Sequence, residues 1–243
     1  MLPNTILLYL IGSVLFCLLA VEMAGADIPL PKPQINNPKK QLKIAAVLFA
    51  SAVAVHAALS FTLHNFKPLT QQIAFYAFYV LLIASAVCAA AVNKDRPDAL
   101  GLSTKRIVTL AFFLIPPAGL AFLPGGFANW GFLLRGLAPA AALSIIARTL
   151  FLQGYLQTRL QSALGDIKGV FVAAAAVTIL NIVGNIGLMK PEVIAVFAAG
   201  TFVIAGVLMG FIYRRSGNIF GLVILNIFWD TAVKVFAGMG VGN

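Results

Sequence analysis

A small set of polar side chains falls inside long apolar runs of this 243-residue sequence, and these residues are the first candidates for chemistry. The set is His56, Arg135, Arg148, Gln153, Asn181, Asn185, Asn226, Asp230 and Lys234. An ionisable group at the centre of a bilayer costs roughly 2.5 to 3.5 kcal/mol, so each one needs a partner or a function. Hydrogen bonding between helices is the simplest role. Hydrolysis by a centre that uses Asp230 and His56 is the more demanding one.

The spacing of these residues indicates that several share helix faces. Positions four apart lie on one face, and this spacing relates Thr149 to Gln153, Asn181 to Asn185, and Asn226 to Asp230 and then Lys234. Lipid offers no hydrogen-bond partner, so helices with such faces should turn them toward one another. The sequence therefore predicts a polar centre built from three helices.

Two ion pairs are possible within this centre. Arg148 could pair with Asp230 across the bundle, with the amides and Thr149 supplying hydrogen bonds. Alternatively, Asp230 could pair with Lys234 one turn along, leaving Arg148 to extend toward the cytoplasm. Either arrangement avoids an unpaired buried charge. His56, alone on an alanine-rich segment, is interpreted as a packing residue, and Gly206 with Gly210 as a small-residue face for close helix contact.

The composition requires that membrane helices carry these residues. Hydrophobic residues make up 61% of the chain and charged residues 10%, with a mean hydropathy of +0.98, which excludes a soluble globule. Apolar runs of spanning length occupy residues 5–24, 44–63, 72–93, 107–124, 131–158, 169–189, 193–213 and 218–238. We therefore predict an all-α, polytopic transmembrane bundle of about eight spans. It forms a single integral membrane domain over 1–243, with three spans in 1–100 and a core in 101–243.

The net charge of +10 fits membrane orientation better than nucleic-acid binding, because the basic residues lie in short loops. Twelve Lys and Arg residues fall in one alternate set of loops, and only Lys67 and Lys190 fall in the other. This asymmetry places both termini on the non-cytoplasmic side. The Pro-rich segment 27–43 is expected to run non-helically along the cytoplasmic surface. Residues 5–24 are interpreted as a retained span, with a signal cleaved near Ala24–Ala26 as the alternative.

Two segments resemble signatures of the CPBP family (CAAX protease and bacteriocin-processing, or Abi) of intramembrane proteases. Residues 148–165 read RTLFLQGYLQTRLQSALG, which is similar to the family's EExxxRG signature and the basic helix end that follows it. Residues 206–219 and then Asn226–Asp230 are similar to the last helix pair, which ends in HxxxN or HxxxD. Leu100–Leu102 also resembles a family element. The resemblance covers residues 98–238 and implies an eight-helix membrane protein.

Several members of that family cut prenylated or leader-bearing substrates with a metal-activated water, but this chain departs from their motifs. The resemblance places Arg148 and Thr149 at the paired glutamates, and Gln153 at the motif arginine. Asn181 and Asn185 stand at the phenylalanine and histidine of FxxxH, and Asn226 at the histidine of HxxxN. Asp230 alone keeps a permitted residue. Zinc needs imidazole, thiolate or carboxylate ligands, so we expect no metal and no other cofactor.

These observations predict a catalytically inactive relative that acts in the membrane as a scaffold or assembly partner for another membrane protein. One alternative is an intramembrane endopeptidase with a rebuilt centre of Asp230 and His56. The other is a protein that binds a lipid or isoprenoid ligand, with Arg135 or Arg159 at an anionic head group. The expected partners are therefore the lipid bilayer and a membrane protein, with no nucleic acid. The expected location is a bacterial cytoplasmic (inner) membrane.

Overall fold

The structure is a computed structural model that describes residues 3–24, 35–63, 66–102, 110–119, 139–185 and 191–236. The described residues are helical almost throughout, which confirms the predicted all-α fold. The elements are α1 (Pro3–Ala24), α2 (Pro38–Thr62), α3 (Pro68–Val92), the short 3-10 turn η2 (Pro97–Leu100), α4 (Leu110–Gly119), α6 (Pro139–Thr149), η5 (Leu150–Gln157), α7 (Thr158–Leu164), α8 (Asp166–Asn185), α9 (Pro191–Gly200), η6 (Thr201–Leu208), α10 (Met209–Ser216) and α11 (Ile219–Phe236).

Two of the helices are built from three consecutive elements each. The elements α6, η5 and α7 run without a break from Pro139 to Leu164, and α9, η6 and α10 run from Pro191 to Ser216. The central parts η5 and η6 are π-helical. Counted in this way, the described residues form eight helices, and each of the eight predicted spans overlaps one of them.

Proline and glycine set many of the helix ends. Pro38 and Pro68 stand at the first turn of α2 and α3, where the missing N–H would have no partner in the helix anyway. Gly217 adopts a positive φ of 58° at the end of α10 and donates its N–H to the Tyr213 carbonyl. A residue with a side chain would be strained there, so this glycine ends the helix and lets α11 turn back.

Within the described residues, four helices are long and apolar enough to cross a membrane. They are Pro38–Thr62, Pro68–Val92, Asp166–Gly184 and Val193–Ser216, and the shorter segments Ile11–Met23 and Ile219–Trp229 are also apolar. Large apolar side chains on them face outward: Leu81 is 65% exposed and Val92 82%. Such a surface is stable in lipid rather than in water. The chain is therefore an integral membrane protein.

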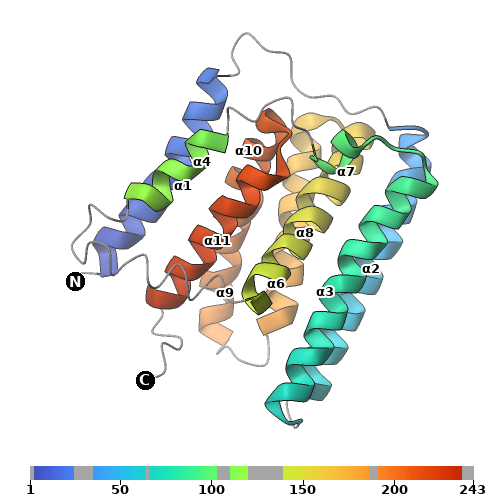
Figure 1. The fold of residues 1–243 in the computed structure, drawn as a ribbon, viewed down its shortest axis with the longest axis horizontal. Coiled ribbons are helices and arrows are strands. Elements are labelled where there is room, and N and C mark those ends of the chain that lie inside the picture. Colours follow the sequence, from blue (N-terminus) through green and yellow to red (C-terminus); the bar gives the residue numbers. More distant parts are fainter. Residues whose placement is uncertain are drawn as a thin grey trace.

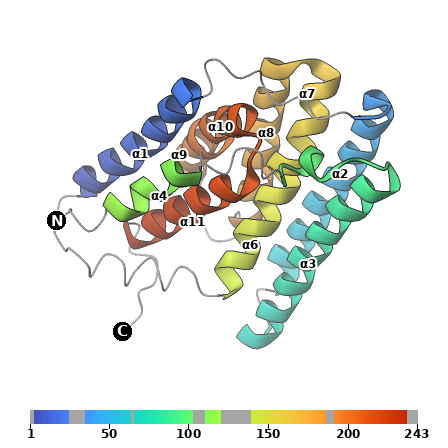
Figure 2. The same cartoon turned by 45° about the horizontal axis from the view of Figure 1, so that its top comes forward.

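The helices form a bundle whose centre is made by the later part of the chain (Figures 1 and 2). The α2–α3 hairpin lies on one side, α1 with α4 lies on the other, and the remaining helices lie between them. Close helix contact depends on small residues. A Cβ on Gly206 of η6 would lie 2.6 Å from the Ala174 Cβ of α8, and one on Gly210 of α10 would lie 2.9 Å from Val170 Cγ1 of α8. Helix α8 therefore packs directly against η6 and α10.

Two predicted boundaries were wrong. The fifth span was expected to end at residue 158, but the helix continues to Leu164 and α8 begins at Asp166, because Arg159 and Leu160, which follow the expected end, are buried rather than exposed in a loop. Segment 27–43 was expected to be non-helical, but α2 starts at Pro38. Residues 25–34 and 120–138 lie outside the described part, so Arg135 is not placed.

Candidate functional site

A cavity of about 110 Å³ lies at the centre of the bundle. It is lined by side chains from six elements: Ile145, Arg148 and Thr149 of α6, Leu152 and Gln153 of η5, Val177 and Asn181 of α8, Phe197 of α9, Thr201 and Ala205 of η6, and Asn226 and Trp229 of α11. Its wall thus combines a guanidinium, amides and hydroxyls with aromatic and aliphatic groups. This mixture distinguishes the cavity from the apolar packing around it.

Arg148 is the charged group of this described wall, and it is held from two sides. Its Nη1 donates to Asn181 Oδ1 at 2.6 Å, and its Nε donates to the Ser144 carbonyl one turn back at 3.3 Å. Asn181 in turn donates its Nδ2 to the Val177 carbonyl at 2.8 Å, which fixes the amide with its oxygen toward the arginine. Helix α8 therefore orients the guanidinium through a neutral amide.

The other polar side chains of the wall connect three more elements. Asn226 Nδ2 of α11 donates to Thr149 Oγ1 at 3.2 Å. Gln153 Nε2 of η5 donates to the Ala205 carbonyl of η6 at 3.4 Å, so a side chain of one π-helical segment meets a backbone carbonyl of the other. A π-helical turn interrupts the regular backbone ladder, and such segments are frequent at functional sites.

The structure brings most of the predicted centre together. Arg148, Thr149, Gln153, Asn181 and Asn226, which come from three helices, all line the cavity. The side chains of Asn185, Asp230 and Lys234 lie outside the described residues, so both predicted ion pairs of Asp230 remain predictions. The contribution of α9 and η6 was missed, although Thr201, a polar residue in an apolar run, was an available signal.

His56 lies in α2 and is not among the residues that line the described cavity. It is buried and stacks on Phe78 of α3 with a ring distance of 4.9 Å. A Cβ on Gly184 would lie only 2.5 Å from its Cε1, so this glycine gives the imidazole room against α8. These contacts agree with the packing role predicted for His56.

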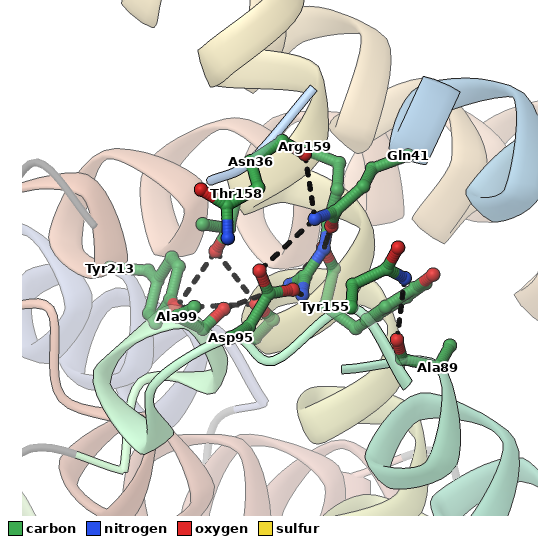
Figure 3. A network of polar contacts seen from close by, with 11 residues as sticks. Asn36, Gln41, Ala89, Asp95, Ala99, Tyr155, Thr158, Arg159 and Tyr213 are labelled. Atoms are coloured by element: carbon green, nitrogen blue, oxygen red, sulfur yellow. Dashed lines mark hydrogen bonds and ion pairs between the residues drawn. The ribbon is translucent and has the colours of Figure 1, made fainter. Parts of the chain in front are cut away.

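A second polar network lies nearer the helix ends and was not predicted. Arg159 of α7 is fully buried and forms an ion pair with Asp95, with Nη2 and Oδ2 2.5 Å apart. Gln41 of α2 bridges the two, because it accepts from Arg159 Nε at 3.3 Å and donates to Asp95 Oδ1 at 3.0 Å. Figure 3 shows the three side chains pointing toward one another. The guanidinium also lies over the Tyr155 ring, 4.1 Å from its centroid.

Neighbouring groups extend this network to η2 and α10. Arg159 Nη1 donates to the Ala99 carbonyl at 2.9 Å, and the Thr158 and Tyr213 hydroxyls lie 3.1 Å apart (Figure 3). Gly154 lets η2 approach, since a Cβ there would lie 2.6 Å from the Leu100 carbonyl oxygen. The network thus fastens the α2–α3 hairpin to the central helix.

This finding corrects the role expected for Arg159. The residue was placed among the loop cations and considered as an anchor for a lipid head group. Its side chain is 0% exposed and already paired with Asp95, so no lipid reaches it. The signal in the sequence was Asp95, an acid among basic residues in the segment after α3.

The described cavity wall does not fit a metal ion. Zinc takes imidazole, thiolate or carboxylate ligands, whereas this wall offers a guanidinium, amides and hydroxyls. A guanidinium repels a cation and stays protonated at any physiological pH. Over the described residues, no three His, Cys, Asp or Glu side chains gather in one place. The wall is instead rich in hydrogen-bond donors around one positive charge.

Comparison with known proteins gives one match. Residues 129–232 match the family described as Type II CAAX prenyl endopeptidase Rce1-like. This segment is shorter than the expected 98–238, covers less than half of the chain, and includes every described residue of the cavity wall. No curated protein and no solved structure matches the chain.

Proposed function

We propose that this membrane protein, which carries an Rce1-like domain over residues 129–232, acts as a scaffold or assembly partner for another membrane protein. In this proposal it binds a segment of that partner at its central cavity and does not hydrolyse peptide bonds. The observation that supports this most strongly is Arg148, whose guanidinium lies in the cavity wall and bonds to the Asn181 amide. A guanidinium in this position repels a metal ion and cannot act as a general base.

The chemical reason concerns what hydrolysis requires. A water molecule must be deprotonated by a base or activated by a metal before it attacks a carbonyl. The resemblance to the CPBP family places Arg148 and Thr149 where the glutamates stand, and amides at Asn185 and Asn226 where the histidines stand. A guanidinium does not accept a proton, and amides are poor metal ligands. The hydrolytic step therefore lacks its activating groups at these positions.

The scaffold role follows from what the chain retains. The elements α6, η5, α8, α9, η6 and α11 still line a cavity, and small residues such as Gly206 still allow close packing of these helices. A fold can keep its architecture while its site takes another role. We infer that this cavity holds a segment of another membrane protein.

Metal binding tests the proposed loss of chemistry. We expect the protein, purified in mild detergent, to carry no stoichiometric zinc and to leave a prenylated peptide ending in a CAAX sequence intact. The matched comparison is the variant Arg148→Glu, Thr149→Glu, Asn185→His and Asn226→His, which restores the family residues and should gain zinc. Stoichiometric zinc in the natural chain, or peptide cleavage that Asp230→Ala abolishes, would instead establish the alternative endopeptidase with Asp230 and His56.

A photo-crosslinking residue tests the proposed partner. Placed at Phe197 in the cavity wall, it should yield one discrete adduct with a membrane protein in the native membrane. Placed at Val92, which is 82% exposed on α3, it should label lipid. If the two positions give the same crosslinked products, no partner protein is bound at the cavity.

The cavity wall also supports a second candidate, the lipid-binding function. Phe197 and Trp229 share the cavity with Arg148, so one end of a ligand could be polar and the other apolar. Because Arg159 is buried and paired, the head group of such a ligand would have to bind elsewhere, and Arg148 is the described cation that faces a cavity.

A further inference from the structure

We propose that the central cavity is a binding site for one carboxylate, the head group of a single-chain lipid such as a fatty acid, with Arg148 as its anchor. This inference rests on the lipid-binding candidate above and names the chemical class of its ligand. It does not depend on whether the protein hydrolyses peptides.

The hydrogen-bond donors of the cavity wall point to an anion. Arg148 has five N–H groups, of which the contacts to Asn181 and Ser144 use two. The Thr149 hydroxyl accepts from Asn226, which leaves its own proton to donate. Gln153 donates one of its two amide N–H groups to the Ala205 carbonyl. The described wall therefore presents several hydrogen-bond donors around one positive charge, as an oxyanion requires.

The balance of charge favours a group with a single negative charge. Arg148 is the one ionisable side chain in the described cavity wall. A carboxylate would neutralise it, whereas a doubly charged phosphate would leave excess negative charge among apolar helices. The planar guanidinium also matches the two oxygens of a carboxylate. Both considerations favour a fatty acid over a phosphorylated lipid.

The apolar side of the cavity fits the same ligand. Phe197, Trp229 and Leu152 supply the apolar surface beside which the start of an alkyl chain could lie.

Trp229 provides a direct measurement. The chain has two tryptophans, Trp130 and Trp229, so Trp130→Phe leaves the cavity residue as the sole tryptophan reporter. In detergent, dibromostearic acid should quench Trp229 fluorescence to a saturating level. The matching dibromo-alcohol, which has the same chain and no charge, should quench weakly and without saturation. Arg148→Met should weaken acid binding by about tenfold or more, and Arg148→Lys by less.

The control variant is Arg96→Met, which removes an exposed arginine and should leave acid binding unchanged. If the acid and the alcohol quench Trp229 equally and to saturation, the site binds lipid but does not recognise the carboxylate, and the proposal is wrong. If neither compound quenches Trp229, both carboxylate recognition and lipid binding at this cavity are contradicted. Because the acid and alcohol are compared on the same protein, this result does not depend on whether the Arg148 variants fold.

Asp230 supplies the remaining discriminating variant. It lies four residues after the cavity residue Asn226, so its carboxylate could fill the site from within. We expect acid binding in the chain that keeps Asp230, with at most a modest gain in Asp230→Asn. Binding that occurs only in Asp230→Asn overturns the proposal, because Arg148 would then be neutralised by the chain itself.

Discussion

At the scale of single residues, two arginines on one continuous helix show how differently a buried cation can be accommodated. Arg159 has a full set of partners, including the carboxylate of Asp95 and the face of Tyr155. Arg148, three turns earlier, meets the neutral amide of Asn181. An ion pair that is fully bonded stabilises the fold, whereas a cation held by amides keeps its charge available to a ligand. We assign a structural role to Arg159 and a ligand-binding role to Arg148.

The ion pair of Arg159 leads to a stability prediction. Asp95→Asn leaves a fully buried guanidinium without its counter-charge, so we expect the free energy of unfolding to fall by about 3 to 5 kcal/mol. Adding Arg159→Met to Asp95→Asn should recover part of this loss, because the uncompensated charge is removed. Unfolding in detergent, followed by tryptophan fluorescence against denaturant, measures both effects.

A surface pair provides the control for this experiment. Asp166 lies 3.8 Å from Arg214 and its side chain is 42% exposed, so Asp166→Asn should change stability by less than about 1 kcal/mol. If Asp95→Asn were as mild as Asp166→Asn, or if the double variant were less stable than the single one, the network would not act as a buried ion pair.

At the scale of elements, the long helix Pro191–Ser216 depends on where its small residues fall. Gly206 faces Ala174 of α8, whereas a Cβ on Gly200 would meet no atom within 4 Å. One glycine therefore permits a close approach between helices, and the other does not. The four-residue spacing of Gly206 and Gly210 predicted a close-contact face, and the packing shows that α8 is the helix that meets it.

These two glycines make a matched pair of variants. Gly206→Ala should destabilise the protein by about 1 to 3 kcal/mol, because the new methyl group would lie 2.6 Å from the Ala174 Cβ and force the helices apart. Gly200→Ala should be neutral or stabilise by up to about 1 kcal/mol, because alanine favours helix. Thermal unfolding of both variants measures the difference. Equal midpoints would show that α8 does not pack at Gly206.

At the scale of the whole molecule, the distribution of charge sets the orientation. Lys67 precedes α3 and Lys94 follows it, and both are exposed. A helix of this length spans about 37 Å at 1.5 Å per residue, more than the hydrocarbon core. We therefore expect the two lysines to lie at opposite faces of the membrane, and the excess of basic residues on the side of Lys94 predicts that this side is cytoplasmic.

Cysteine labelling tests this orientation. In a chain with Cys17→Ala and Cys88→Ala, a membrane-impermeant maleimide added to intact cells should label Lys67→Cys. It should label Lys94→Cys only after the cells are opened. The reverse pattern means that the termini are cytoplasmic, and labelling of both positions in intact cells means that α3 does not cross the membrane.

The sequence alone determined the all-helical class, the approximate position of each helix, and five side chains that line the cavity. These follow from local properties: transfer of apolar side chains into lipid, the backbone limits of proline and glycine, and the four-residue repeat of a helix face. The same local reasoning placed Arg159 in a loop, because a polar turn at the end of an apolar run is normally exposed.

Only the tertiary structure decided which polar groups meet. The pair of Arg159 with Asp95 joins residues 64 apart, and the cavity takes Phe197 and Thr201 from a helix whose sequence is almost uniformly apolar. Such contacts depend on how helices cross and rotate against one another, which is fixed by the fit of side chains along the whole interface. No periodicity within one helix carries that information.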